Sequence, residues 1–232
     1  MRKTFIWFDL GYTLLYLERE KPFLETLRKF DLEADPGKVE RAFHVTDKYF
    51  MREFPGLFGG DRRHSMPWYF GVIQYRLGLR FDLCRFFQSW QKRIGSQLDS
   101  WHPYPFTAET LEDLTAKKYR LGVISNWDAS ARAILRKHGL DRYFEQIIVS
   151  SEVGREKPDE EIFRIALQAA AVEPGECIYV GDNYYDDAVG CRKAGMEPFI
   201  VNPHGELGIE ELENCTVLCD IRELAGHLDG RG

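Results

Sequence analysis

Near its start the chain reads Phe5-Ile6-Trp7-Phe8-Asp9-Leu10-Gly11-Tyr12-Thr13, a short apolar run that ends in a carboxylate. Similar runs recur later, each poorly alternating and followed by polar or small residues: Leu121–Ile124, Ile147–Val149, Ile178–Val180, Pro198–Val201 and Thr216–Leu218. Runs of this kind are typical of strands that are buried on both faces of a sheet. We therefore predict one strand from each run.

Helical patterns separate these predicted strands. One helix is indicated by Ala131, Ile134 and Leu135, and another by the apolar positions between 162 and 169. Pro158 is expected at the first position of that second helix, and Gly195 is expected just beyond the end of a later one. Alternating strands and helices predict an α/β fold, with a Rossmann-like parallel sheet core flanked by helices.

Residues 16–101 have a different character. They are rich in aromatic residues, and their apolar residues have helical spacing, as in the stripe Phe23, Leu24, Leu27 and Phe30. We predict a helical domain over 16–101, inserted into an α/β core domain formed by residues 1–15 and 102–232. The segment His102-Pro103-Tyr104-Pro105 is expected to be a stiff return linker.

Composition restricts the partners and the compartment. The 232 residues carry a net charge of −6, which argues against nucleic acid or an anionic membrane as a partner. The five cysteines are odd in number and contain no CxxC pair, which favours reduced thiols. Asp9 interrupts the first apolar run, and no run approaches the roughly 20 apolar residues of a membrane span. We predict a cytoplasmic protein without a membrane partner, and nothing in the composition indicates an oligomeric state.

Polar side chains follow the predicted strands. Because the carboxyl ends of parallel strands share one edge of a sheet, we expect these residues to lie together: Asp9 and Thr13, Ser125 and Asn126, Lys157, Asp182 and Asp187. Carboxylate oxygens are ligands for Mg²⁺, which also takes phosphate oxygens. A lysine, hydroxyl groups and backbone amides near Asn126 suit the remaining phosphate oxygens. The set predicts a site for a small phosphorylated substrate with Mg²⁺ as cofactor.

These residues, in this order, resemble the four motifs of the haloacid dehalogenase-like (HAD) hydrolase superfamily. The resemblance spans roughly residues 5–224, and the insertion over 16–101 resembles the helical cap domain of one branch. It implies a metal-binding hydrolase of the phosphatase kind, in which Asp9 attacks phosphorus and forms an aspartyl-phosphate.

The resemblance also implies a role for each residue. Thr13 and Ser125 would orient phosphoryl oxygens, and Lys157 would neutralise charge beside Asp9. The substrate-binding residues would be Asn126 and Gly11. The metal would be held by Asp9, Asp182, Asp187 (with Asp186 as the alternative) and the backbone carbonyl of Gly11.

Gly11 departs from the phosphatase pattern, which carries an aspartate there as general acid. The loss matters, since such catalysis contributes typically 10²–10⁴-fold. The substrate could have a good leaving group, such as an acyl, anomeric or aryl phosphate, or another residue could substitute, with Asp128 and His64 as candidates. Three alternative functions stay open: a phosphonate hydrolase with a cap lysine (Lys21, Lys38, Lys48 or Lys92), a haloacid-type hydrolase, or a catalytically impaired binding protein.

Overall fold

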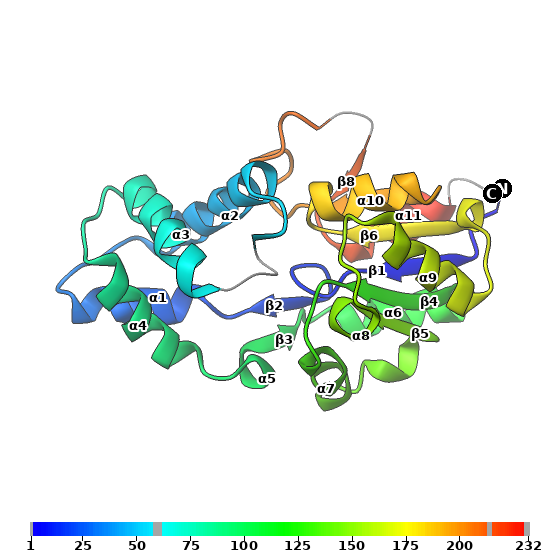
Figure 1. Cartoon of the computed structure of the whole chain (residues 1–232), viewed down its shortest axis with the longest axis horizontal. Helices are drawn as coiled ribbons and strands as arrows, with labels where there is room; N and C mark the ends of the chain where they lie inside the picture. The colour runs from blue at the N-terminus through cyan, green and yellow to red at the C-terminus, as the bar shows by residue number, and fades with distance from the viewer. Residues whose placement is uncertain (1, 58–61, 213–214, 230–232) are drawn as a thin grey trace. The chain divides into compact units, whose positions relative to one another are not determined.

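The computed structural model describes residues 2–57, 62–212 and 215–229, apart from the side chains of residues 62–64 and 97. The chain forms two compact units, one of Met1–Tyr16 with Trp101–Gly232 and one of Leu17–Ser100 (Figure 1). The assignment of 16–101 to a separate cap domain stays a prediction.

A parallel sheet of six strands forms the centre of the first unit, in the order β5-β4-β1-β6-β7-β8. The strands confirm the six predicted runs: β1 (Phe5–Phe8), β4 (Arg120–Ser125), β5 (Gln146–Val149), β6 (Cys177–Gly181), β7 (Glu197–Val201) and β8 (Thr216–Leu218). All residues of β1 and β6 are buried, as expected for a sheet covered on both faces. The α/β fold with a parallel sheet is therefore confirmed. Since β1 pairs with both β4 and β6, the residues that follow these three strands share one edge.

Helices lie between the strands: α6 (Thr107–Ala116), α7 (Ser130–Lys137), α8 (Ser150–Val153), α9 (Glu160–Ala170) and α10 (Val189–Lys193). One more helix, α11 (Leu224–Asp229), follows the last strand. Phe163 and Ala166 of α9 pack with Trp7 and Tyr179 in one apolar core. The predicted position of Pro158 was wrong. Asp159 is the N-cap of α9 and accepts a hydrogen bond from the Glu161 N–H at 3.0 Å, so Pro158 precedes the cap.

The second unit is helical, with α1 (Glu20–Lys29), α2 (Pro36–Glu53), α3 (Arg62–Leu77), α4 (Leu83–Ile94) and α5 (Gln97–Ser100). Its core is aromatic, and the Phe23 ring lies 5.2 Å from Phe43 and 5.0 Å from Phe86. Arg19 is buried beside this core, where it binds Asp47 of α2 through both carboxylate oxygens. This ion pair links the start of α1 to α2.

A two-stranded sheet of β2 (Leu15–Leu17) and β3 (Trp101–Pro103) lies where the chain leaves and re-enters the first unit. The expected linker at His102 and Pro103 is therefore partly a strand. Its pairing with β2 depends on a segment far away in sequence, which local composition does not reveal.

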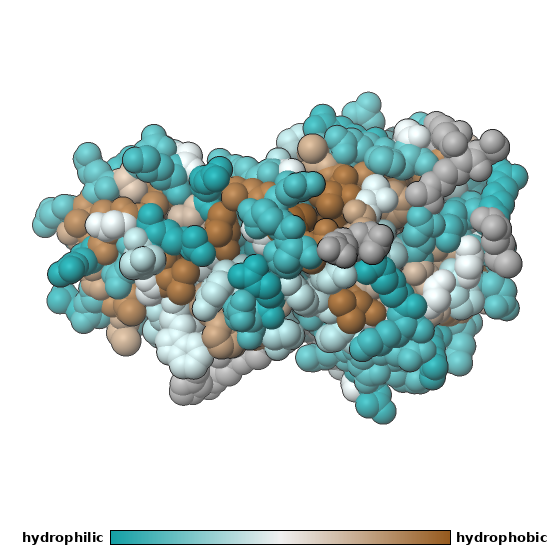
Figure 2. Space-filling view, turned by 90° about the horizontal axis from the view of Figure 1, so that it is seen from above, coloured by the Kyte–Doolittle hydropathy of each residue, from teal (hydrophilic) through white to brown (hydrophobic). Residues whose placement is uncertain are grey.

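The surface seen in Figure 2 is mostly hydrophilic, with hydrophobic patches between the polar side chains. No helix among the described residues is long and apolar enough to cross a bilayer. All five cysteines are free thiols.

Candidate active site

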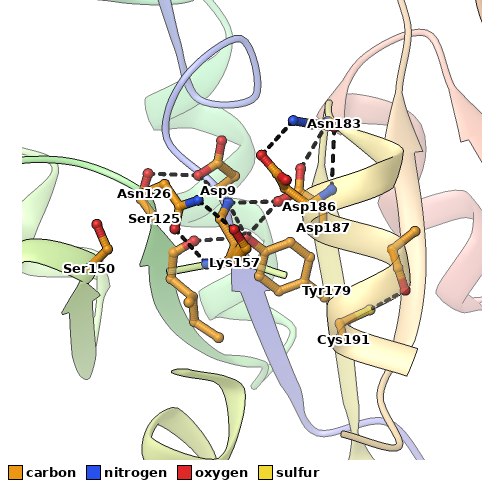
Figure 3. A network of polar contacts seen from close by, with 12 residues as sticks. Asp9, Ser125, Asn126, Ser150, Lys157, Tyr179, Asn183, Asp186, Asp187 and Cys191 are labelled. Carbon is orange, nitrogen blue, oxygen red and sulfur yellow. Dashed lines mark hydrogen bonds and ion pairs between the residues drawn. The ribbon is translucent and has the colours of Figure 1, made fainter. Parts of the chain in front are cut away.

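The candidate site lies at the carboxyl edge of the sheet. Asp9 directly follows β1, Ser125 is the last residue of β4, and Asp182 directly follows β6. Lys157 comes from the loop between α8 and α9, and Asp187 from the single π-helical turn η4 (Tyr184–Ala188). All five residues are buried, and Figure 3 shows four of them in one polar network.

Asp9 receives two hydrogen bonds on one oxygen. Ser125 Oγ donates to Asp9 Oδ1 at 2.7 Å, and Lys157 Nζ donates to the same oxygen at 2.8 Å. The backbone N–H of Asp9 donates to the Val180 carbonyl at 2.8 Å, which ties the end of β1 to β6. The carboxylate is therefore held in a defined orientation by neighbouring strands and by the loop at Lys157.

Lys157 has three acceptors for the three N–H groups of its ammonium. These are Asp9 Oδ1 at 2.8 Å, Asp187 Oδ1 at 2.6 Å and Tyr179 Oη at 2.9 Å (Figure 3). Burial alone would lower the pKa of Lys157, but the carboxylates of Asp187 and Asp9 raise it above its ordinary value. Lys157 is therefore a fixed positive charge.

Asn126 positions Lys157 through the backbone. Its side-chain N–H donates to the Lys157 carbonyl at 2.9 Å, and its Oδ1 accepts from the Lys157 N–H at 2.7 Å. Both functional groups of the amide are thus committed to the protein. The substrate-binding role of Asn126 stays a prediction. Because the side chain is already hydrogen-bonded, the predicted donor to the substrate is the backbone N–H of Asn126.

Three carboxylates converge near Lys157. Asp9, Asp182 and Asp187 each place an oxygen within 4.8 Å of the others. Asp187 Oδ2 accepts from the Asn183 N–H at 2.9 Å, and a Cβ on Gly181 would overlap this carboxylate. Glycine at 181 therefore makes room for Asp187, and Asp187, not Asp186, belongs to the carboxylate group that could hold a metal.

Asp186 lies at the margin of this group. Its Oδ2 accepts from Asn183 Nδ2 at 2.7 Å, while Oδ1 is buried without a hydrogen-bond partner among the described residues. Burial, and then the negative charge of Asp187, raise the pKa of Asp186 to about 7. Burial likewise raises the pKa of Asp187, against the opposing effect of Lys157.

Thr13 and Gly11 lie in the loop after β1. Thr13 is 1% exposed, and its hydroxyl has no hydrogen-bond partner within the described parts of the chain. A buried hydroxyl without a partner loses hydrogen-bonding free energy that a bound phosphate oxygen would restore. The predicted roles of Thr13 and of the Gly11 carbonyl are not tested by any contact in the structure.

Sequence reasoning missed Tyr179 and Asn183. Tyr179 is fully buried in β6 and donates its proton to the Ile124 carbonyl at 2.7 Å, which leaves its oxygen to accept from Lys157. Burial raises the pKa of Tyr179 well above its ordinary value, so it stays protonated. The available signal was a hydroxyl in an otherwise apolar strand that is buried on both faces.

Asp128 and His64 are the two candidates for a replacement acid. Asp128 is exposed, and its Oδ1 accepts from the Ser130 N–H at 2.8 Å, as in a capping contact. The side chain of His64 lies outside the described residues. Of the four lysines considered for a Schiff base, Lys48 is buried, whereas Lys21, Lys38 and Lys92 are exposed.

The fold and the site together define a Rossmann-like α/β protein with an acidic centre at the carboxyl edge of its sheet. The family described as haloacid dehalogenase-like hydrolase matches residues 20–201, and the chain belongs to this family. The expected superfamily is thereby confirmed.

Individual relatives agree with this membership. Human haloacid dehalogenase-like hydrolase domain-containing protein 3 is 31% identical over 204 residues, which cover 83% of this chain and 79% of that protein. Glyceraldehyde 3-phosphate phosphatase of Methanothermobacter thermautotrophicus is 39% identical over 135 residues, 53% of this chain and 57% of that protein. The magnesium-bound crystal structure of YfnB from Bacillus subtilis shares the fold, with a TM-score of 0.69 and 18% identity over 99% of this chain and all of that one.

Proposed function

We propose that this chain is a magnesium-dependent phosphohydrolase of small phosphorylated metabolites that works through an aspartyl-phosphate on Asp9. The observation that carries the proposal is the buried group of Asp9, Asp182 and Asp187, two of which, Asp9 and Asp187, bind the Lys157 ammonium. Such a set of charges suits the attack of a carboxylate on a phosphate. The positive charges neutralise the phosphate oxygens, and they reduce the repulsion between those oxygens and the carboxylate nucleophile.

The residues fit a divalent cation. Three carboxylates converge within 4.8 Å, and one ammonium, already bound to two of them, leaves an excess of negative charge. Asp9, Asp182 and Asp187 would hold Mg²⁺, with the Gly11 carbonyl as the predicted backbone ligand. The bound ion would supply positive charge that neutralises the phosphate oxygens.

The protein's own residues would then direct the attack. Ser125 and Lys157 both bind Oδ1 of Asp9, so we assign the attack on phosphorus to Oδ2. Lys157 contributes charge and orientation, because its three N–H groups already have acceptors. Thr13, whose buried hydroxyl is without a partner among the described residues, would bind a phosphoryl oxygen.

The test is a screen of purified protein against p-nitrophenyl phosphate, acetyl phosphate and glyceraldehyde 3-phosphate, with magnesium or with a chelator. We expect magnesium-dependent turnover that Asp9→Asn abolishes, because the change removes the nucleophile and little volume. Asp113→Asn on the exposed face of α6 serves as the matched control, and circular dichroism confirms that each variant is folded. Turnover by folded Asp9→Asn above a few per cent of wild type would contradict the covalent mechanism.

A phosphonate hydrolase is the second candidate, favoured by the burial of Lys48 on α2. Lysine amines form Schiff bases with carbonyl substrates. Borohydride trapping with phosphonoacetaldehyde would label the wild type and not Lys48→Arg if this candidate is correct. The absence of labelling would exclude it.

A further inference from the structure

The space beside Gly11 is filled by two tryptophans. A Cβ on Gly11 would lie 3.4 Å from Cζ3 of Trp127 and 3.5 Å from Cη2 of Trp101. The two indole rings contact one another edge to face, with centroids 4.8 Å apart. The backbone does not require glycine here, since the left-handed φ of this loop belongs to Tyr12 at 52° and not to Gly11. The glycine instead brings its backbone close to two aromatic rings.

This aromatic wall, defined as Trp101 and Trp127, borders the loop that carries the proposed nucleophile, because both rings approach Gly11. Gly11 is two residues beyond Asp9, and Trp127 is two residues beyond Ser125, in the loops that follow the adjacent parallel strands β1 and β4. Ser125 and Asp9 are joined by a hydrogen bond of 2.7 Å. Gly11 and Trp127 therefore lie at the same edge of the sheet as the reacting carboxylate. Gly11, Trp101 and Trp127 all belong to one compact unit.

The wall offers no proton at Gly11. The indole N–H of Trp127 donates to Ser130 Oγ at 3.0 Å, and the atoms of both rings that approach Gly11 are carbons. Two other donors of the site are also committed, because Tyr179 donates to the Ile124 carbonyl and Lys157 has three acceptors. The Thr13 hydroxyl, which has no partner among the described residues, is a weak acid and is assigned to a phosphoryl oxygen. Asp186 is the one titratable neighbour in the described network with a buried oxygen that lacks a partner.

From this arrangement, and resting on the proposed phosphohydrolase function, we propose a substrate class. The substrate is a phosphate whose leaving oxygen is bonded to a planar, unsaturated carbon, as in aryl, enol or acyl phosphates. The planar group packs against Trp127, which is half-buried, while the buried Trp101 contacts that ring edge to face. The leaving oxygen departs as a delocalised anion that needs no proton. Planar groups suit this wall because aromatic contacts contribute about 0.5–1.5 kcal/mol beyond burial of area.

The reaction balances without a general acid. A bond forms between Asp9 Oδ2 and phosphorus while the bond from phosphorus to the leaving oxygen breaks, and that oxygen keeps the electron pair. Water then attacks phosphorus, the Asp9 carboxylate is released with its electron pair, and the water's proton passes to phosphate or solvent. An alkoxide from an alkyl phosphate is strongly basic, so the same step would be slow without protonation.

The first experiment uses the wild-type chain with magnesium and a series of substituted phenyl phosphates, together with acetyl phosphate and ethyl phosphate. We expect kcat/KM to fall steadily as the basicity of the leaving group rises, with ethyl phosphate at least about 100-fold below phenyl phosphate. A flat series, or an alkyl phosphate hydrolysed as fast as phenyl phosphate, would overturn the proposed substrate class. Failure of the phosphohydrolase function itself is distinguishable, because no member of the series, acetyl phosphate included, would then be hydrolysed.

The second experiment tests the wall. Trp127→Leu keeps an apolar side chain and removes the ring, and Trp68→Leu on α3, 62% exposed, is the matched control. We expect KM for phenyl phosphate to rise about tenfold in Trp127→Leu, as loss of roughly 1.4 kcal/mol predicts, and KM for ethyl phosphate, whose leaving group is not planar, to rise much less. Equal changes for both substrates, in a variant that circular dichroism shows to be folded, would overturn the packing role.

A third variant examines Asp186. In Asp186→Asn the ratio of ethyl to phenyl phosphate hydrolysis is expected to stay as in the wild type. A selective loss of ethyl phosphate hydrolysis in this variant would show that Asp186 supplies a proton, and would overturn the proposal.

Discussion

Tyr179 Oη lies 2.9 Å from Lys157 Nζ and acts as the third acceptor of that ammonium. The hydroxyl has a single proton, and the Ile124 carbonyl at 2.7 Å is a nearer acceptor for it than Asp187 Oδ1 at 3.2 Å, so the oxygen faces Lys157 as an acceptor. Through this contact β6 and β4 together orient the lysine that binds Asp9. Tyr179 is thus placed to act through Lys157 without touching the substrate.

The first prediction follows from this relationship. Tyr179→Phe removes one acceptor and frees one N–H of Lys157, so kcat should fall about tenfold, the equivalent of roughly 1.4 kcal/mol, while KM changes little. Steady-state kinetics measures the effect on kcat and KM, and thermal unfolding measures the effect on stability. The control is Thr26→Val, which removes an equally buried hydroxyl that donates to the Pro22 carbonyl within α1. A purely structural role for Tyr179 would lower the unfolding temperature and leave kcat of the folded enzyme intact.

The second prediction concerns the metal. Asp182→Ala should weaken magnesium binding at least about tenfold, since loss of a ligand's hydrogen-bond partner alone typically costs 10–100-fold. Isothermal calorimetry with magnesium alone measures this without any substrate. Asp113→Ala, at an exposed position of α6, should bind magnesium as the wild type does. Equal affinity in the Asp182 variant would show that this carboxylate is not a ligand.

The third prediction is a pH dependence of stability in the presence of a chelator. The pKa of Asp186 rises from 3.8 to about 7 on folding, so between these values the folded chain holds a proton that the unfolded chain has released. Raising the pH through this window therefore costs the folded state up to about 1.4 kcal/mol per pH unit from this group.

Asp186→Asn removes this dependence while it keeps the shape of the side chain. Urea unfolding from pH 5 to pH 8 should show the wild type losing stability relative to the variant as the pH rises. If the free energy of unfolding of the wild type and that of the variant change in parallel from pH 5 to pH 8, the pKa of Asp186 is not raised in the folded chain.

The fourth prediction concerns Gly11. A Cβ fits at 3.4 Å from Trp127, but a carboxylate beyond it would meet the indole rings, so Gly11→Asp alone should not accelerate hydrolysis of ethyl phosphate. With Trp127→Ala the carboxylate has room, and the double variant should exceed Trp127→Ala alone about tenfold, part of the 10²–10⁴-fold that an acid contributes. The kcat/KM values of the four proteins measure this coupling. An equal gain from Gly11→Asp alone would show that the rings leave room for an acid.

Much of the fold followed from the sequence because its signals are local. Each strand of the six-stranded sheet was visible as a short apolar run, and the parallel arrangement follows from the helices between them. The helix start at Glu160 differed by two residues from the predicted start at Pro158, because the cap depends on which side chain turns back to the backbone. The pairing of β2 with β3 was missed because its partners are far apart in sequence.

The sequence by itself determined which residues gather at the candidate site, since residues that follow parallel strands must share an edge of the sheet. Thus Asp9 and Ser125, 116 residues apart, lie within hydrogen-bonding distance. Tertiary structure decided what each side chain faces. It directs Asp187 rather than Asp186 into the carboxylate group, and it places Tyr179 against Lys157. It also packs two indoles against Gly11, because side-chain direction depends on packing between distant segments that no local pattern encodes.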